Sequence, residues 1–256
     1  MTEEPETTAA ATQFDQLGEV YDTFSRSPFR RHLEFPTVFG HLGDVTGLAV
    51  LDFGCGSGVY TRLLKQRGAE RAVGLDVTPG MVEHARGIEL KDPVGAEYVI
   101  GPLPSELDGT FDVVLAVYVL PYVTDHQQLL DFSLTAARAL RPGGRLVALP
   151  ANPGLRRDRD YYERYGLRTY GASAGTDPDP VTLDLCYEDL DETLSAWVWS
   201  AGAVDAALTQ SGFTGITWLD PVVSDSGVEE LGPEFWQPYR DCPHALTVQA
   251  RSPLEV

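Results

Sequence analysis

The strongest constraint on the fold is an alternation of short apolar runs with longer helical segments between residues 48 and 149. This alternation is typical of consecutive βαβ units, which build a parallel sheet covered by helices. Strands are predicted at residues 48–53, 72–76, 97–100, 111–117 and 145–149. Two helix starts carry capping signals, Thr78 before Pro79 and Thr124 with Gln127 three residues on. The sequence therefore predicts an α/β protein.

Different patterns flank this central stretch. Residues 1–13 are polar and acidic, and we expect a disordered tail there. Residues 14–46 have apolar side chains at helical spacing from Phe14 onward, interrupted by prolines. Residues 151–199 lose the α/β rhythm and end in two alternating segments, 181–187 and 193–199, which predict a hairpin with an acidic turn. We interpret the chain as one domain over residues 14–256, with N-terminal helices and a cap insertion at about 151–199.

Composition excludes several classes of partner. The formal net charge is −19, and so acidic a surface repels nucleic-acid backbones and anionic membrane surfaces. The longest apolar run, residues 113–120, is far shorter than the roughly 20 residues of a membrane span. The three cysteines lack the spacing of a zinc site or of a disulfide framework. We expect a cytoplasmic monomer or homodimer that holds no metal and acts on a small molecule.

A glycine-rich loop follows the first predicted strand. Residues 52–58 read Asp-Phe-Gly-Cys-Gly-Ser-Gly and precede a helical segment, which is where open parallel sheets bind ligands. Glycines permit left-handed backbone angles there and let a bulky ligand approach the main chain. Asp76 ends the next strand, 18 residues after Gly58, where its carboxylate can accept hydrogen bonds from both ribose hydroxyls. These features predict a site for a cofactor that contains adenosine.

The spacing of the loop discriminates between two such cofactors. Dinucleotide-binding loops read GxGxxG and seat a pyrophosphate, whereas this loop reads GxGxG after an acid, Asp52. A carboxylate is poorly placed beside a pyrophosphate but suits the cationic amino group or sulfonium of S-adenosylmethionine. We therefore favour S-adenosylmethionine, with S-adenosylhomocysteine as its product. An NAD-dependent oxidoreductase remains as an alternative.

Three segments, residues 50–58, 73–81 and 140–146, resemble motifs of the class I S-adenosylmethionine-dependent methyltransferases. The resemblance implies a Rossmann-like class I methyltransferase sheet of seven strands, the last one antiparallel, with helices on both faces and a cap insertion. Late strands predicted at residues 215–219 and 245–250 agree with that fold.

A narrower resemblance concerns residues 116–122 and 234–239, which are similar to the toxoflavin-type methyltransferases of small heterocycles. In relatives, a tyrosine and an arginine of the N-terminal helices reach the cofactor carboxylate, and Tyr21 and Arg31 stand at matching positions. Where relatives often have Gly-Asp-Ala beside the adenine, this chain has Gly-Pro-Leu at 101–103, which removes one carboxylate partner. The expected cofactor-binding residues are Tyr21, Arg31, Asp52, Gly54, Cys55, Gly56, Gly58, Asp76, Val77, Met81, Gly101, Pro102, Leu103, Ala116 and Val117.

Methyl transfer is an in-line displacement that requires alignment and exclusion of water more than a base. If a base is used, the candidates are Tyr118 and Tyr122 after the fourth strand, and His32. Packing between sheet and cap is the alternative for the tyrosines. Aromatic residues gather in the insertion and the tail, where they could stack a flat substrate or pack in the core. The substrate-pocket candidates are Tyr162, Tyr165, Trp197, Trp199, Trp236 and His244.

These observations lead to one functional hypothesis and a rival. The hypothesis is a methyltransferase that acts on a nitrogen, oxygen or carbon of a small planar or heterocyclic compound, in the biosynthesis of an antibiotic or other secondary metabolite. The rival is a protein of the same fold that binds S-adenosylmethionine but catalyses a non-methylating reaction such as cyclisation, because the glycine loop indicates binding and not transfer.

Overall fold

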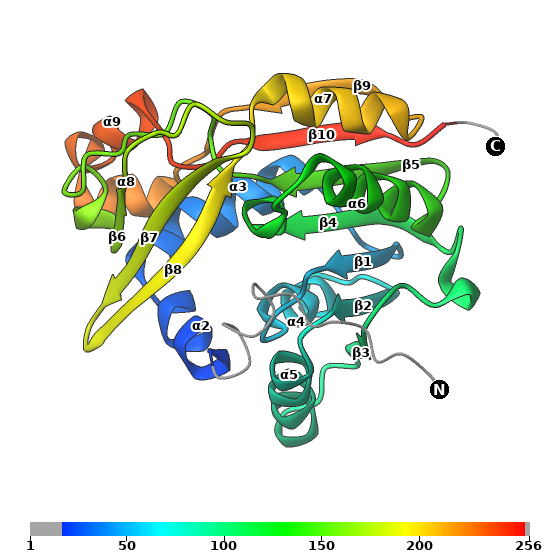
Figure 1. Ribbon diagram of the computed structural model, residues 1–256. Coiled ribbons are helices and arrows are strands. Elements are labelled where there is room, and N and C mark those ends of the chain that lie inside the picture. The colour runs from blue at the N-terminus through cyan, green and yellow to red at the C-terminus, as the bar shows by residue number, and fades with distance from the viewer. Residues whose placement is uncertain (1–16, 254–256) are drawn as a thin grey trace, which may run out of the picture.

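The computed structural model describes residues 17–253 (Figure 1). The tail predicted at residues 1–13, and Phe14, lie outside the described residues. The described chain begins with three short helical elements, α2 (Gly18–Ser25), η1 (Arg30–Glu34) and α3 (Phe35–Leu42). Of these, η1 is a turn of π-helix, in which the Phe35 N–H bonds back to the Arg30 carbonyl.

The main sheet contains seven strands in the order β3-β2-β1-β4-β5-β10-β9. Strands β1 to β5 pair in parallel, whereas β10 runs antiparallel to both β5 and β9. The predicted α/β fold with a reversed last strand is thus confirmed. The strands are β1 (Ala49–Phe53), β2 (Arg71–Asp76), β3 (Glu97–Ile100), β4 (Phe111–Val117), β5 (Leu140–Leu149), β9 (Thr214–Leu219) and β10 (Thr247–Arg251).

Helices cover both faces of the sheet because its central strands are apolar on both sides. On one face, Leu51 and Val114 pack in a core with helices α6 and α7. On the other, Val50 and Val113 pack with α3 and α4. The elements between the strands are α4 (Val59–Gln66), α5 (Pro79–Lys91), η2 (Ser105–Leu107), η3 (Leu120–Tyr122), α6 (His126–Ala139) and α7 (Ala201–Gln210).

A second, three-stranded antiparallel sheet lies beside α2 and η3, in the order β6-β7-β8. It follows η4 (Glu163–Tyr165) and consists of β6 (Leu167–Tyr170), β7 (Asp179–Tyr187) and β8 (Leu190–Val198). We call this sheet the cap. Two differences from the expected hairpin are visible. The turn is shorter than predicted, because Glu188 adopts a left-handed φ of 54° and Tyr187 already pairs with Leu190. The short strand β6 was not predicted.

Other boundaries also differ from the sequence prediction. Helix α6 is capped by Asp125, whose side chain accepts a hydrogen bond from the Gln128 N–H, and not by Thr124 with Gln127. Two helices of the tail, α8 (Asp225–Leu231) and α9 (Pro233–Asp241), were not predicted.

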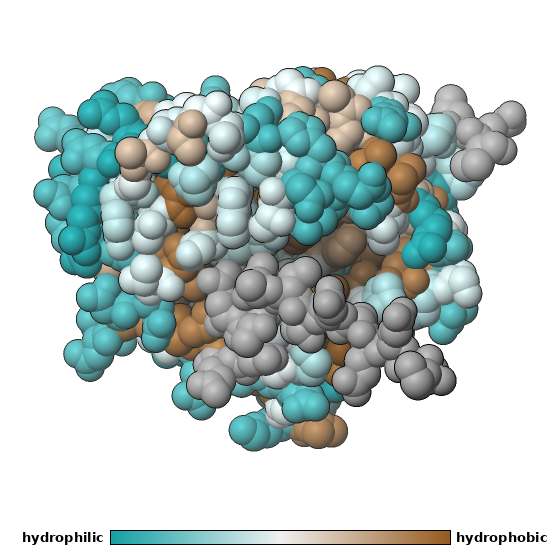
Figure 2. Space-filling model, viewed as in Figure 1, coloured by the Kyte–Doolittle hydropathy of each residue, from teal (hydrophilic) through white to brown (hydrophobic). Residues whose placement is uncertain are grey.

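Two features concern possible partners. The face in Figure 2 is largely hydrophilic, with hydrophobic side chains visible mainly in its hollows. No helix within residues 17–253 is long and apolar enough to cross a membrane.

Candidate active site

Two cavities adjoin at the carboxyl ends of the parallel strands. One, which we call the glycine-loop cavity, has a volume of about 230 Å³ and is lined by the loop after β1 and the ends of β2 and β4. The other, the cap cavity, has a volume of about 60 Å³ and lies between the cap and the N-terminal helices. Both are lined by the same four residues at their junction, Tyr21, Arg30, Tyr118 and Tyr122.

The glycine loop is held by its own backbone. The Gly54 N–H donates to the Leu75 carbonyl at 2.7 Å, which ties the loop to β2. Gly54 and Gly56 have φ angles of 73° and 51°, a region that disfavours residues with side chains. A Cβ atom on Gly54 would also lie 2.5 Å from Val119. The loop therefore needs glycine for both its backbone angles and its close packing.

Asp52 is a buried acid that lines the glycine-loop cavity. Its Oδ2 accepts a 2.6 Å hydrogen bond from the Thr61 hydroxyl. Burial raises the pKa of Asp52 to about 7, and the nearby Asp76 carboxylate adds to this, against the lowering effect of the Thr61 hydrogen bonds. A cation in the cavity would favour the ionised form of this carboxyl group.

Asp76 joins the glycine loop to the start of α5. Its Oδ2 accepts a 2.8 Å hydrogen bond from the Gly56 N–H, and its Oδ1 accepts a 2.9 Å hydrogen bond from the Thr78 N–H. Each carboxylate oxygen can accept a further hydrogen bond. Val77, the next residue, is 61% exposed and offers an apolar surface at the edge of the same cavity.

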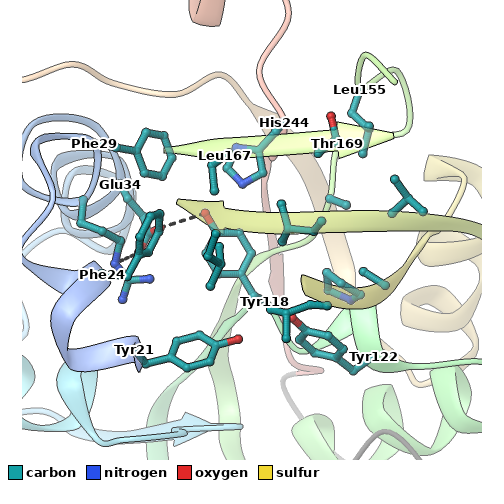
Figure 3. A pocket seen from close by; sticks show the side chains of 18 residues that line it. Tyr21, Phe24, Phe29, Glu34, Tyr118, Tyr122, Leu155, Leu167, Thr169 and His244 are labelled. Atoms are coloured by element: carbon teal, nitrogen blue, oxygen red, sulfur yellow. Dashed lines mark hydrogen bonds and ion pairs between the residues drawn. The ribbon is translucent and has the colours of Figure 1, made fainter. Parts of the chain in front are cut away.

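A buried polar cluster stands at the junction of the cavities (Figure 3). The Glu34 carboxylate accepts hydrogen bonds from the Tyr60 hydroxyl at 2.6 Å and from the Tyr118 hydroxyl at 2.9 Å. The Arg30 Nε atom lies 2.9 Å from Glu34 Oε1. Burial lowers the pKa of Arg30, but Glu34 and nearby tyrosines outweigh it, so the net pKa is raised and the guanidinium is charged. Glu34 thus fixes Arg30 at the lining of both cavities.

Tyr118 has an unusual backbone at this junction. Its φ of 56° is rare for a residue with a side chain and is a form of strain found at functional sites. Burial, followed by the Glu34 carboxylate, raises the pKa of Tyr118 well above its ordinary value. Burial also raises the pKa of Tyr122 to about 12, against the lowering effect of a hydrogen bond with Tyr21. The two tyrosines proposed as bases, Tyr118 and Tyr122, therefore keep their protons at neutral pH.

The cap cavity has mostly apolar walls. The inward faces of the cap strands supply aliphatic side chains, and the N-terminal helices supply Phe24 and Phe29. His244, which follows α9, completes the wall and lies near Tyr118 in Figure 3. The cap residues that line the cavity are Leu167, Thr169, Val181, Leu183, Leu185, Leu194 and Ala196.

The predicted cofactor residues divide into two groups. Nine of them line the glycine-loop cavity: Tyr21, Asp52, Gly54, Cys55, Gly56, Asp76, Val77, Met81 and Val117. The six that do not are Arg31, Gly58, Gly101, Pro102, Leu103 and Ala116.

Five of these six residues face the core or lie in backbone turns beside the cavity. Leu103 and Ala116 face the buried core. Gly58 starts α4 with a φ of 82° and is covered by Tyr98, and Gly101 donates its N–H to the Asp76 carbonyl. Pro102 belongs to that same bend after β3.

Arg31 is replaced by its neighbour Arg30 as the arginine at the cavities. The Arg31 side chain is 51% exposed and lies 3.9 Å from Glu230, away from both cavities. Adjacent side chains on a helical turn point in different directions, and Arg30 is the one on the same side as Glu34, with which it pairs.

His32 and most predicted substrate aromatics also lie away from the cavities. His32 Nδ1 is 3.3 Å from the Ser224 hydroxyl and its Nε2 is 3.0 Å from Glu230, so it joins η1 to α8. In β8, the side chains of Leu194 and Ala196 point into the cap cavity. Because successive side chains of a strand point to opposite faces, Trp197, the residue after Ala196, points outward. Of the six substrate candidates only His244 lines the cap cavity.

The four other aromatics are core residues with satisfied polar atoms. Trp199 donates its Nε1–H to the Val123 carbonyl, and Trp236 donates to the Gly227 carbonyl. The Tyr165 hydroxyl donates to the Phe235 carbonyl, and Tyr162 packs in the same cluster. Trp199 thus packs in the core of the main sheet, whereas Tyr162, Tyr165 and Trp236 share a cluster that joins the insertion to the tail.

Sequence reasoning missed Arg30, Glu34, Tyr60 and the aliphatic lining of the cap. One signal was present: Arg30 and Glu34 are four residues apart, the spacing of an ion pair on a helix. No group of three or more His, Cys, Asp or Glu side chains in the described part of the chain is arranged to hold a metal.

Comparisons with known proteins agree with this geometry. Residues 51–148 match the family model described as a methyltransferase domain. A demethylmenaquinone methyltransferase of Tropheryma whipplei is 32% identical over 181 residues, which are 69% of this chain and 71% of the relative. A ubiquinone biosynthesis O-methyltransferase of Xanthomonas oryzae is 33% identical over 112 residues, 43% of this chain and 45% of that protein. The crystal structure of an S-adenosylmethionine-dependent methyltransferase from Mesorhizobium loti has a TM-score of 0.61 at 22% identity, covering 89% of this chain and 99% of that one, and shares the fold.

The fold and the glycine-loop cavity define a class I methyltransferase architecture. The chain belongs to the S-adenosylmethionine-dependent methyltransferases. The residues present fit that cofactor, because the cavity combines two carboxylates, one guanidinium and an apolar edge. These groups complement an amino group, ribose hydroxyls, a carboxylate and a purine. The alternative of an NAD-dependent oxidoreductase is set aside.

Proposed function

We propose that this enzyme methylates a small, mostly apolar substrate with a planar ring, which binds in the cap cavity. The observation that carries the proposal is the direct junction of an apolar cavity with the glycine-loop cavity through four shared residues. Support comes from two relatives, a demethylmenaquinone methyltransferase and an O-methyltransferase of ubiquinone biosynthesis. The resemblance of residues 116–122 and 234–239 to toxoflavin-type enzymes supports a ring substrate of secondary metabolism.

The proposal includes roles for the residues of the glycine-loop cavity. S-adenosylmethionine, when bound, supplies a methyl group on a positively charged sulfur. Asp76 accepts hydrogen bonds from the ribose hydroxyls, and Asp52 faces the cationic part of the cofactor. Arg30, charged and fixed by Glu34, holds the cofactor carboxylate. Val77 and Met81 pack against the adenine.

The junction residues act by position in this proposal. Tyr118 and Tyr122 retain their protons at neutral pH, since burial raises the pKa of both hydroxyls. They enclose the acceptor and exclude water from it, which favours an in-line reaction. The accepting nitrogen, oxygen or carbon must then be nucleophilic without a strong base from the enzyme.

The test is transfer of an isotopically labelled methyl group. The enzyme would be incubated with methyl-labelled S-adenosylmethionine and a panel of quinols, phenols and nitrogen heterocycles, and the products analysed by mass spectrometry. We expect the label in at least one ring compound. Transfer to protein or RNA instead, or conversion of ring compounds without label, would contradict the proposal.

A further inference from the structure

His244 lies in the tail of the chain and lines the cap cavity. Its Nδ1 atom has a partner in Tyr239, which leaves Nε2 for a ligand. We propose that His244 presents its Nε2–H to the substrate as a neutral hydrogen-bond donor. The substrate ring then carries a hydrogen-bond acceptor at that position, either a carbonyl or ionised oxygen or an unprotonated ring nitrogen. This inference rests on the proposed function, because it places the substrate in the cap cavity.

The position of the proton on the His244 ring follows from Tyr239. The Tyr239 hydroxyl lies 2.7 Å from His244 Nδ1 and is buried. Burial and the Glu34 carboxylate raise the pKa of Tyr239, against a hydrogen bond from the Ala245 N–H, so the hydroxyl keeps its proton. The acceptor at hydrogen-bonding distance from the buried Tyr239 hydroxyl is His244 Nδ1, so the hydroxyl proton is donated to that nitrogen. A neutral imidazole that accepts at Nδ1 carries its own proton at Nε2.

The His244 ring is neutral as well as oriented. Burial lowers the pKa of His244 to about 3, so the ring holds one proton at physiological pH. Within residues 17–253, no protein group forms a hydrogen bond with Nε2, and this atom is not fully enclosed by the protein. Nε2 is thus accessible from the cavity that the ring lines.

The backbone around His244 is fixed by the start of the insertion. The Asn152 N–H donates to the His244 carbonyl at 2.8 Å, and the Asn152 side chain donates to the Pro243 carbonyl at 2.7 Å. The His244 ring packs against Phe29 and Tyr118, with ring centroids 5.6 and 5.7 Å away. The donor is therefore held in place before a substrate binds.

The other hydroxyls in the cavity wall have partners within the protein. Thr169 donates to the Arg156 carbonyl at 2.6 Å, Tyr118 donates to Glu34 at 2.9 Å, and Tyr21 and Tyr122 hydrogen-bond with each other. In a cavity with mostly apolar walls, a fixed donor selects ligands by the group it meets and orients their ring. His244 is thereby a positioning and specificity residue, and it is not the base.

The tautomer can be measured directly by ¹⁵N NMR of the histidine rings in the full chain saturated with S-adenosylhomocysteine. The His244 signals would be assigned by their loss in His244→Gln. We expect a protonated Nε2 and an unprotonated Nδ1 from pH 6 to pH 9, and a loss of this preference in Tyr239→Phe. A proton on Nδ1 of the wild-type ring would overturn the proposal. This readout needs no methyl transfer, so it is independent of whether the proposed function holds.

The ligand class can be tested with two isosteric one-ring probes, pyridine and benzene, which differ by one ring nitrogen. We expect the wild type to prefer pyridine, and His244→Leu to reduce that preference about 3- to 10-fold, the effect of one neutral hydrogen bond. His244→Gln, which keeps an N–H near the Nε2 position, should restore part of it. An unchanged preference in His244→Leu, or no binding of pyridine to the wild type, would overturn the assignment.

Discussion

The two cavities are built in opposite ways. The glycine-loop cavity is held mainly by bonds within one βαβ segment, such as Thr61 to Asp52 and Gly56 to Asp76. The cap cavity brings together Phe24, the cap strands and His244 through long-range packing. Most of the cofactor cavity is therefore built by one βαβ segment, to which the N-terminal helices add Tyr21 and Arg30, whereas the substrate cavity depends on how the cap and the tail pack. Each prediction below tests one side of this division.

The largest effect is expected for Asp76→Ala in the glycine-loop cavity. Loss of two charge-assisted hydrogen bonds to ribose should weaken S-adenosylhomocysteine binding by about 100-fold or more, measured by calorimetry. Asp92→Ala is the control, because Asp92 is 78% exposed and, among the described residues, its salt bridge is with Arg62. Wild-type affinity in Asp76→Ala would remove Asp76 from the cofactor site.

A smaller loss is expected for Arg30→Lys at the junction. Lysine can keep the charge beside Glu34 but lacks the guanidinium fork, so S-adenosylhomocysteine should bind about 10-fold more weakly. Binding of 5′-methylthioadenosine, which has no carboxylate, should be unchanged. Arg31→Lys is the matched control, and an equal loss in that variant would contradict the choice of Arg30 over Arg31.

Cofactor binding should also depend on pH through Asp52. Its pKa is raised to about 7 in the free protein, and a cationic ligand prefers the ionised carboxylate. Affinity for S-adenosylhomocysteine should therefore fall as pH drops through 7, by up to about tenfold from pH 8 to pH 6. Asp52→Asn should bind weakly with a flatter profile. An affinity that rises on acidification would show that Asp52 does not face a cation.

The last prediction concerns stability, through the packing that holds the cap against the sheet. Trp199→Phe removes the hydrogen bond to the Val123 carbonyl and part of a buried ring, which should lower the free energy of unfolding by about 1–3 kcal/mol. Trp197→Phe, on the outward face, should change it by less than about 0.5 kcal/mol. Denaturant unfolding measures both, and a larger loss for Trp197 would reverse the assigned faces.

The sequence predicted the sheet and the glycine loop because both depend on local patterns. Strand periodicity, turn glycines and the spacing from Gly58 to Asp76 are properties of one segment. The choice of Arg30 over Arg31 was only partly predictable. The spacing of Arg30 and Glu34 indicates an ion pair, but that this pair lines the cavities depends on how the N-terminal helices pack. The outward position of Trp197 was predictable from the sequence. In β8, Leu194, Ala196 and Val198 alternate with larger or polar residues, and that parity assigns the aliphatic face to the cavity.

The most direct test of separate cofactor and substrate cavities is Ala196→Phe. Ala196 is 5% exposed and lines only the cap cavity, whereas Ser195 beside it points outward and provides the control Ser195→Phe. Affinity for S-adenosylhomocysteine and transfer of labelled methyl to an accepted ring compound would be measured on both variants. We predict wild-type affinity in both and loss of transfer only in Ala196→Phe. Full transfer in Ala196→Phe would contradict the assignment of the substrate to the cap cavity.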